Sequence, residues 1–171
     1  MEVKGMTFLY TLATLMITFA GFSALLLSVR QAAGARLSVL DRYLTKTVII
    51  HIFVLTAGAL LPAVLALYDL PEKSIWQVSS VLFGLPMLSL QATYPYRRRK
   101  VIGAPVPPAI MAVFVVLGFV VTLAMLVCVL AGFPYGAGAY IPAVTIDFFT
   151  VLFAFLTALE VILQQPVKGS K

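Results

Sequence analysis

Five apolar runs of membrane-spanning length follow one another along this chain, with short polar connections between them. They cover about residues 6–29, 47–68, 74–94, 108–132 and 139–163, each near the ~20 residues with which a helix crosses a hydrocarbon core of ~30 Å. No run alternates between apolar and polar residues as a barrel strand would, and a helix satisfies its own backbone groups in lipid. The pattern therefore predicts an all-α integral membrane protein, with residues 1–171 forming a single domain of five transmembrane helices.

Polar residues recur at helical spacing inside three of these runs. In the last run, Asp147, Thr150 and Thr157 share one stripe, and Glu160 lies on its flank. The third run carries a stripe of the same period, and we expect it to be buried against protein. It consists of Gln77, Ser80, Gly84, Met87 and Gln91.

The first run carries a stripe of small and hydroxyl-bearing residues, which predicts a close-packing face for a neighbouring helix rather than a water-lined one. It consists of Thr7, Thr11, Thr14, Thr18, Gly21 and Ser28. The fourth run has only Thr122 and Cys128 as polar interruptions, so we expect it to face lipid. The first, third and fifth helices would then supply the polar interior.

Composition and charge indicate the class of protein and its orientation in the membrane. Residues are 62% hydrophobic and 11% charged, which leaves no soluble domain, and the net charge of +6 concerns topology and lipid rather than nucleic acid. Ten Lys and Arg residues lie in the first and third loops and at the C-terminus, whereas the other side holds Lys4 and Lys73. Because cytoplasmic loops are enriched in these residues, the count predicts an N-terminus outside and a cytoplasmic C-terminus. A bacterial inner membrane is the expected location.

The basic run of the third loop follows Tyr94 and Tyr96, an aromatic anchor at the membrane surface. Its charges are expected to act as a topology determinant and to contact anionic lipid headgroups. The run consists of Arg97, Arg98, Arg99 and Lys100.

The strongest candidates for chemistry are the titratable groups within the spans. A charged side chain at bilayer depth costs at least a few kcal/mol, so it usually faces a bundle interior or a water-filled path. Depth along the helices predicts Gln77 and Ser80 near Asp147, and Gln91 near Glu160. His51, at a similar inner depth to Glu160, would complete a ladder of the kind that proton and cation pathways use.

Each member of this ladder also has a structural interpretation. Glu160 is close enough to the boundary to extend to it or to pair with an arginine, and Asp147 could be a hydrogen-bonded packing residue or a contact to a partner subunit. His51 could be a hydrogen-bonded structural residue. Gln77 and Gln91 could hold helices together.

The residue inventory argues against most enzyme classes. The single histidine, His51, cannot provide bis-histidine haem ligation, and the single cysteine, Cys128, cannot run a thiol relay. Motifs of serine hydrolases, zinc proteases and phosphate-binding loops are absent from the sequence. We therefore expect no enzymatic activity, no metal and no cofactor.

One resemblance rests on the first run, where residues 19–25 read Phe-Ala-Gly-Phe-Ser-Ala-Leu and Arg30 follows. This stretch resembles the opening helix of small, uncharacterised bacterial multi-pass inner-membrane proteins. The resemblance covers one helix and implies no activity.

Two functions remain open from the sequence. The first is a small proton or cation channel or transporter-like protein that uses Asp147 as its central titratable group, with Glu160 and His51 at the cytoplasmic mouth. The second is a non-catalytic structural or regulatory subunit of a membrane complex, whose polar stripes bind other helices. Either function fits a homo-oligomer or an assembly with a partner membrane subunit, joined through the first or fifth helix.

Overall fold

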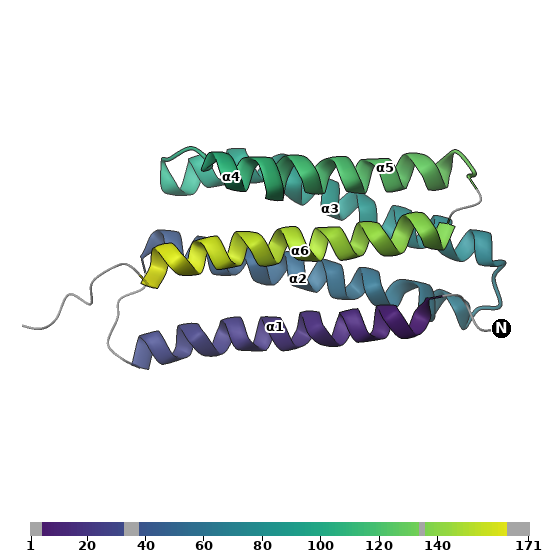
Figure 1. Ribbon diagram of the computed structural model, residues 1–171, viewed down its shortest axis with the longest axis horizontal. Helices are drawn as coiled ribbons and strands as arrows, with labels where there is room; N and C mark the ends of the chain where they lie inside the picture. The colour runs from purple at the N-terminus through teal and green to yellow at the C-terminus, as the bar shows by residue number, and fades with distance from the viewer. Residues whose placement is uncertain (1–4, 33–37, 134–135, 164–171) are drawn as a thin grey trace, which may run out of the picture.

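A computed structural model describes residues 5–32, 38–133 and 136–163, and every regular element among them is helical (Figure 1). The elements are α1 (Met6–Ala32), α2 (Val39–Ala66), α3 (Glu72–Ile102), α4 (Pro108–Ile110), a π-helical segment η1 (Met111–Leu117), α5 (Gly118–Leu130) and α6 (Gly136–Leu163). Since α4, η1 and α5 follow one another without a break, the described residues contain five helices long and apolar enough to cross a membrane. The prediction of an all-helical protein with five helices long and apolar enough to span a membrane is confirmed.

Two helices extend beyond the apolar runs that predicted them. The second begins at Val39 because Ser38 and Asp41 form a capping box, each side chain accepting a hydrogen bond from the other's backbone N–H. The third continues through the basic run and ends at Gly103, whose φ of 74° is the left-handed conformation that glycine adopts readily. Both extensions lie at one end of the bundle, which we call the basic end.

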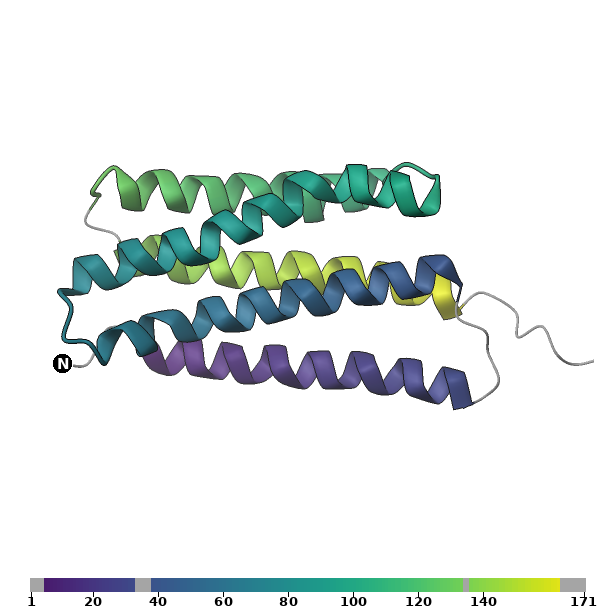
Figure 2. The same cartoon turned by 180° about the vertical axis from the view of Figure 1, so that it is seen from behind.

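The helices form two layers along a common axis (Figures 1 and 2). One layer holds α1, α6 and α5 in that spatial order, with α6 in the middle. The other layer holds α2, which packs on α1 and α6, and α3, which packs on α2 and α5. The last helix thus contacts every other long helix of the bundle.

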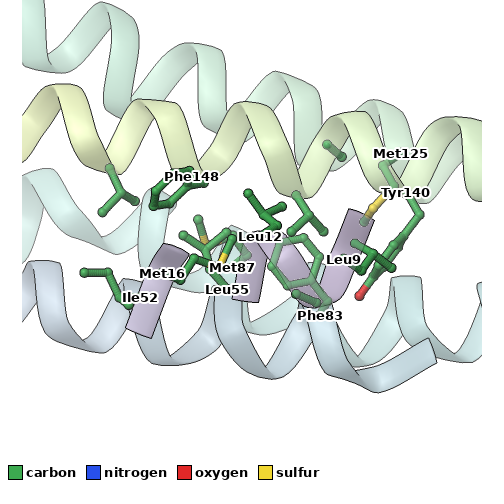
Figure 3. Packing of buried hydrophobic residues seen from close by; sticks show 14 of the residues in the cluster. Leu9, Leu12, Met16, Ile52, Leu55, Phe83, Met87, Met125, Tyr140 and Phe148 are labelled. Carbon is green, nitrogen blue, oxygen red and sulfur yellow. The ribbon is translucent and has the colours of Figure 1, made fainter. Parts of the chain in front are cut away.

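Apolar side chains from these helices meet between the two layers (Figure 3). Leu9, Leu12 and Met16 of α1 face Ile52 and Leu55 of α2 across the core, and all five are buried. Helix α1 is also joined to α6 by Phe19. Its ring makes edge-to-face contacts with Phe148 and Phe155, at centroid distances of 6.3 and 4.8 Å.

The predicted environment of the fourth span is wrong, and the close-packing face predicted for the first span has no partner helix among the described residues. Helix α5 is not simply lipid-facing, because it packs between α3 and α6 and buries Thr122 completely. Helix α1 is the least buried of the five. Its small-residue stripe is exposed rather than packed against another helix of this chain, and a methyl group added at Gly21 would meet nothing within 4 Å.

Candidate functional site

The carboxyl group of Asp147 lies inside the bundle, where it is completely buried. Helix α6 begins at Gly136 and has 28 residues, so Asp147 is about 16 Å along it and lies well inside an apolar helix long enough to cross a membrane. A carboxyl group at this depth requires polar partners, because an unsatisfied polar group in apolar surroundings is costly.

Two neutral side chains supply those partners, one to each carboxyl oxygen. Gln91 of α3 donates from Nε2 to Oδ1 of Asp147 at 3.0 Å. Thr122 of α5 lies on the other side, with its Oγ1 2.7 Å from Oδ2. Both partners are fully buried, so three helices converge on this group. We call Asp147, Gln91 and Thr122 the carboxyl cluster.

Gly118 leaves the space that the carboxyl cluster occupies. A Cβ at this position would lie 2.5 Å from Nε2 of Gln91 and 3.1 Å from Oδ1 of Asp147. The backbone carbonyl of Gly118 is also 3.0 Å from Oγ1 of Thr122. A glycine here lets α5 approach both polar side chains closely.

The π-helical segment η1 ends immediately before Gly118. Its wide turn carries Phe114, whose ring lies between two residues near the basic end, with centroid distances of 4.9 Å to His51 and 5.0 Å to Tyr94. Short π-helical segments within α-helices are frequent at functional sites. This one lies beside the carboxyl cluster.

His51 is fully buried within the bundle. Because α2 begins at Val39 rather than at residue 47, the histidine lies about 18 Å from the first residue of the helix instead of about one turn from it. Its Nδ1 is 2.7 Å from the carbonyl of Thr47, while Nε2 has no hydrogen-bond partner among the described residues. Oε1 of Gln91 likewise has no partner there.

The predicted pairing of the other site residues is wrong. Gln91 contacts Asp147 rather than lying beside Glu160, and Gln77 instead approaches the carbonyl of Val129 at 3.5 Å. Ser80 is buried and makes no hydrogen bond through its hydroxyl among the described residues. The side chain of Glu160 lies outside the described residues. Helix α3 crosses the bundle obliquely (Figure 2), so depth counted from the ends of the two spans was misleading for Gln91.

Two members of the site were not predicted, namely Thr122 and Gly118. A signal was present, since they are four residues apart and therefore form the small-xxx-small pattern that allows close helix packing. It was outweighed by the apolar character of the surrounding run.

The basic run is divided by the fold. Arg98 is buried, whereas Arg99 and Lys100 are exposed. Arg97 is half-buried and donates from one guanidinium nitrogen to the carbonyl of Leu90 at 2.8 Å. These residues therefore do not form a uniform surface patch.

No cluster of histidine, cysteine or acidic side chains suited to a metal ion occurs in the described part of the chain. Comparison of the chain with protein-family models, with curated proteins and with solved structures finds no match.

Proposed function

We propose that this protein is a small proton or cation channel or transporter-like protein in which Asp147 takes up and releases a proton. The observation that carries the proposal is the bonding of its carboxyl group. Each oxygen is hydrogen-bonded to a side chain, Gln91 or Thr122, that can act both as a donor and as an acceptor. Both contacts lie inside the helical bundle.

The carboxyl cluster suits both protonation states of Asp147. When the group is ionised, the hydroxyl of Thr122 donates to Oδ2 at 2.7 Å. When a proton binds to Oδ2, that oxygen donates to Oγ1 of Thr122, and the threonine hydroxyl turns to the carbonyl of Gly118 at 3.0 Å. The same three heavy atoms serve both states, so the proton can come and go without rearrangement of the helices.

Two buried polar atoms could carry the proton between Asp147 and the basic end of the bundle. Oε1 of Gln91 and Nε2 of His51 are both buried without a protein partner among the described residues. Such groups are uncommon, and they are usually explained by water or by a functional role. In this proposal Gln91 and His51 lead from Asp147 to the cytoplasm, with Glu160 at the mouth.

The orientation belongs to the same proposal. The distribution of Lys and Arg favours a cytoplasmic basic end and an N-terminus outside, in a bacterial inner membrane. The proton would then pass between the exterior and Asp147 along the half of the bundle that holds Gln77 and Ser80.

The test is dissipation of a pH gradient by purified protein in liposomes, with an imposed membrane potential and matched insertion. Asp147→Asn is the informative variant, because the amide can accept from Gln91 and donate to Thr122, which keeps the hydrogen bonds but removes the titration. Glu72→Gln is the matched control, since it neutralises an exposed carboxylate that accepts a hydrogen bond from Trp76. We expect flux in the wild type and in the control and its loss in Asp147→Asn.

A second candidate function rests on a different observation, the exposed stripe of α1. Thr11, Thr14 and Thr18 each donate to a carbonyl of the preceding turn, so their hydroxyls need no water and the face can enter a helix–helix contact. This favours a structural or regulatory subunit that binds a partner helix, or a second copy of the chain, through α1.

The same purified preparation can distinguish the transport function from the subunit function. Two results together would favour the subunit over transport. The first is no flux from well-inserted wild-type protein, and the second is a co-purifying partner that is lost when Gly21→Leu blocks the stripe. Flux that survives in Gly21→Leu and disappears in Asp147→Asn supports transport.

A further inference from the structure

A pocket opens between α2 and α3 at the basic end of the bundle. Its volume is about 480 Å³. Four of the side chains that line it are cationic, two from each helix. They are Arg42 and Lys46 of α2 and Arg97 and Lys100 of α3.

The charge in this pocket is of one sign. Among the described residues no carboxylate belongs to its lining, so the four cationic side chains repel one another. Arg97 is held in place by its hydrogen bond to the carbonyl of Leu90. A bound anion would relieve the repulsion among the four cationic side chains.

Helical spacing explains why the cations converge. Arg42, Lys46 and Ile50 are four residues apart and so share one face of α2, while Arg97 and Lys100 are neighbours on α3. The two pairs of cations are far apart in the sequence, so their proximity does not follow from chain connectivity. The packing of α2 against α3 brings them to one pocket.

The lining is not uniformly polar. Val39, Ile50 and Val101 contribute apolar surface, and Tyr43 and Thr47 contribute hydroxyl groups. Ile50 lies two turns further into the bundle than Arg42 on the same face of α2. The site therefore combines a cationic mouth with an apolar wall.

We propose that this pocket binds a phosphate group. Arginine and lysine together are the side chains that proteins use to hold phosphate oxygens, the guanidinium by paired hydrogen bonds and the ammonium as a point charge. The phosphate is carried either by the headgroup of an anionic phospholipid, whose acyl chain follows the wall at Ile50, or by a free phosphate compound from the aqueous side.

The first experiment counts bound phosphatidylglycerol on the purified full-length chain in detergent by native mass spectrometry, with phosphatidylcholine as the zwitterionic comparison. The pocket variant is Lys46→Gln with Lys100→Gln. The control is Lys73→Gln with Arg99→Gln, which removes the same two charges from exposed positions outside the pocket. We expect binding to weaken about tenfold in the pocket variant and to stay at the wild-type level in the control.

Competition distinguishes the two sources of the phosphate. If millimolar inorganic phosphate displaces the lipid from the wild type, the site recognises free phosphate as well. If it does not, the site requires the lipid. Equal weakening in the pocket variant and in the control would overturn the proposal, because it would show a general surface attraction.

A second variant guards against a folding defect in the first. Val101→Trp fills the pocket from a residue that is 49% exposed and leaves every charge in place. Reduced phosphatidylglycerol binding in this variant supports the pocket. Wild-type binding in both Val101→Trp and the pocket variant would exclude it.

Discussion

The hydroxyl of Tyr140 donates a hydrogen bond to the carbonyl of Gly58, 2.6 Å away on α2. That carbonyl would normally accept from the N–H four residues later, but this position is Pro62, which has no N–H. A free carbonyl in a membrane core is costly, and an intramembrane proline is tolerated where a neighbouring helix satisfies the group it frees. Tyr140 therefore joins α6 to α2 at the point where α2 lacks a backbone hydrogen bond.

Tyr140→Phe should destabilise the bundle by about 1–3 kcal/mol, because it leaves the carbonyl of Gly58 buried without a donor. Reversible unfolding in mixed micelles measures the change in unfolding free energy. Tyr68→Phe, at an exposed tyrosine near the end of α2, is the control and should have little effect. Adding Pro62→Ala restores the backbone N–H, so the penalty of Tyr140→Phe should shrink in that background. A penalty unaffected by Pro62→Ala would show that this carbonyl is not what the hydroxyl satisfies.

Gly118→Ala should disrupt the carboxyl cluster. The added methyl group would lie 2.5 Å from Nε2 of Gln91, so either the glutamine moves away from Asp147 or α5 shifts outward. Overpacking of this kind costs about 1–3 kcal/mol. We expect a lower unfolding free energy and loss of any flux that depends on Asp147.

Gly21→Ala is the matched control for that substitution, since its methyl group would meet nothing within 4 Å and alanine favours the helix. It should leave stability unchanged or raise it slightly. If the two glycine variants behaved alike, the close approach of α5 to Gln91 would be wrong.

Asp147→Leu and Asp147→Asn should differ in stability. Leucine leaves Nε2 of Gln91 without its acceptor, at a cost of about 1–3 kcal/mol, whereas asparagine can keep both contacts of the carboxyl group. Thermal unfolding of the three proteins at one detergent concentration is sufficient to rank them. Equal melting temperatures for Asn and Leu would show that these hydrogen bonds contribute little to folding.

The spans could be predicted from the sequence because hydrophobic length is a strong and local signal. The carboxyl cluster could be predicted only in part. Asp147 and Gln91 stand out as polar residues in apolar runs, but their pairing depends on the oblique crossing of α3, which is a property of packing and not of either segment. Thr122 was assigned to a lipid-facing helix because a single hydroxyl in an apolar run carries no information about its neighbours.

The start of α2 shows a related limit. Residues 39–46 are too polar to be counted in a hydrophobic run, yet the capping box at Ser38 makes them helical. The apolar run that begins at residue 47 places His51 about one turn from the end of its helix, whereas the helix itself begins eight residues earlier. Local backbone chemistry, rather than hydropathy, sets where this helix begins.

His51→Leu separates a structural role of the histidine from a role in proton movement. Nε2 is buried without a partner among the described residues, and the carbonyl of Thr47 that Nδ1 contacts lies four residues earlier in the same helix. An apolar side chain of similar volume should therefore leave the unfolding free energy unchanged or raise it, since it removes an unsatisfied polar atom beside Phe114. Under the transport proposal the same substitution should sharply reduce proton flux from the basic end. A stable variant with undiminished flux would remove His51 from the pathway and leave Asp147 to exchange its proton by another route, whereas marked destabilisation would assign the histidine to the packing of α2.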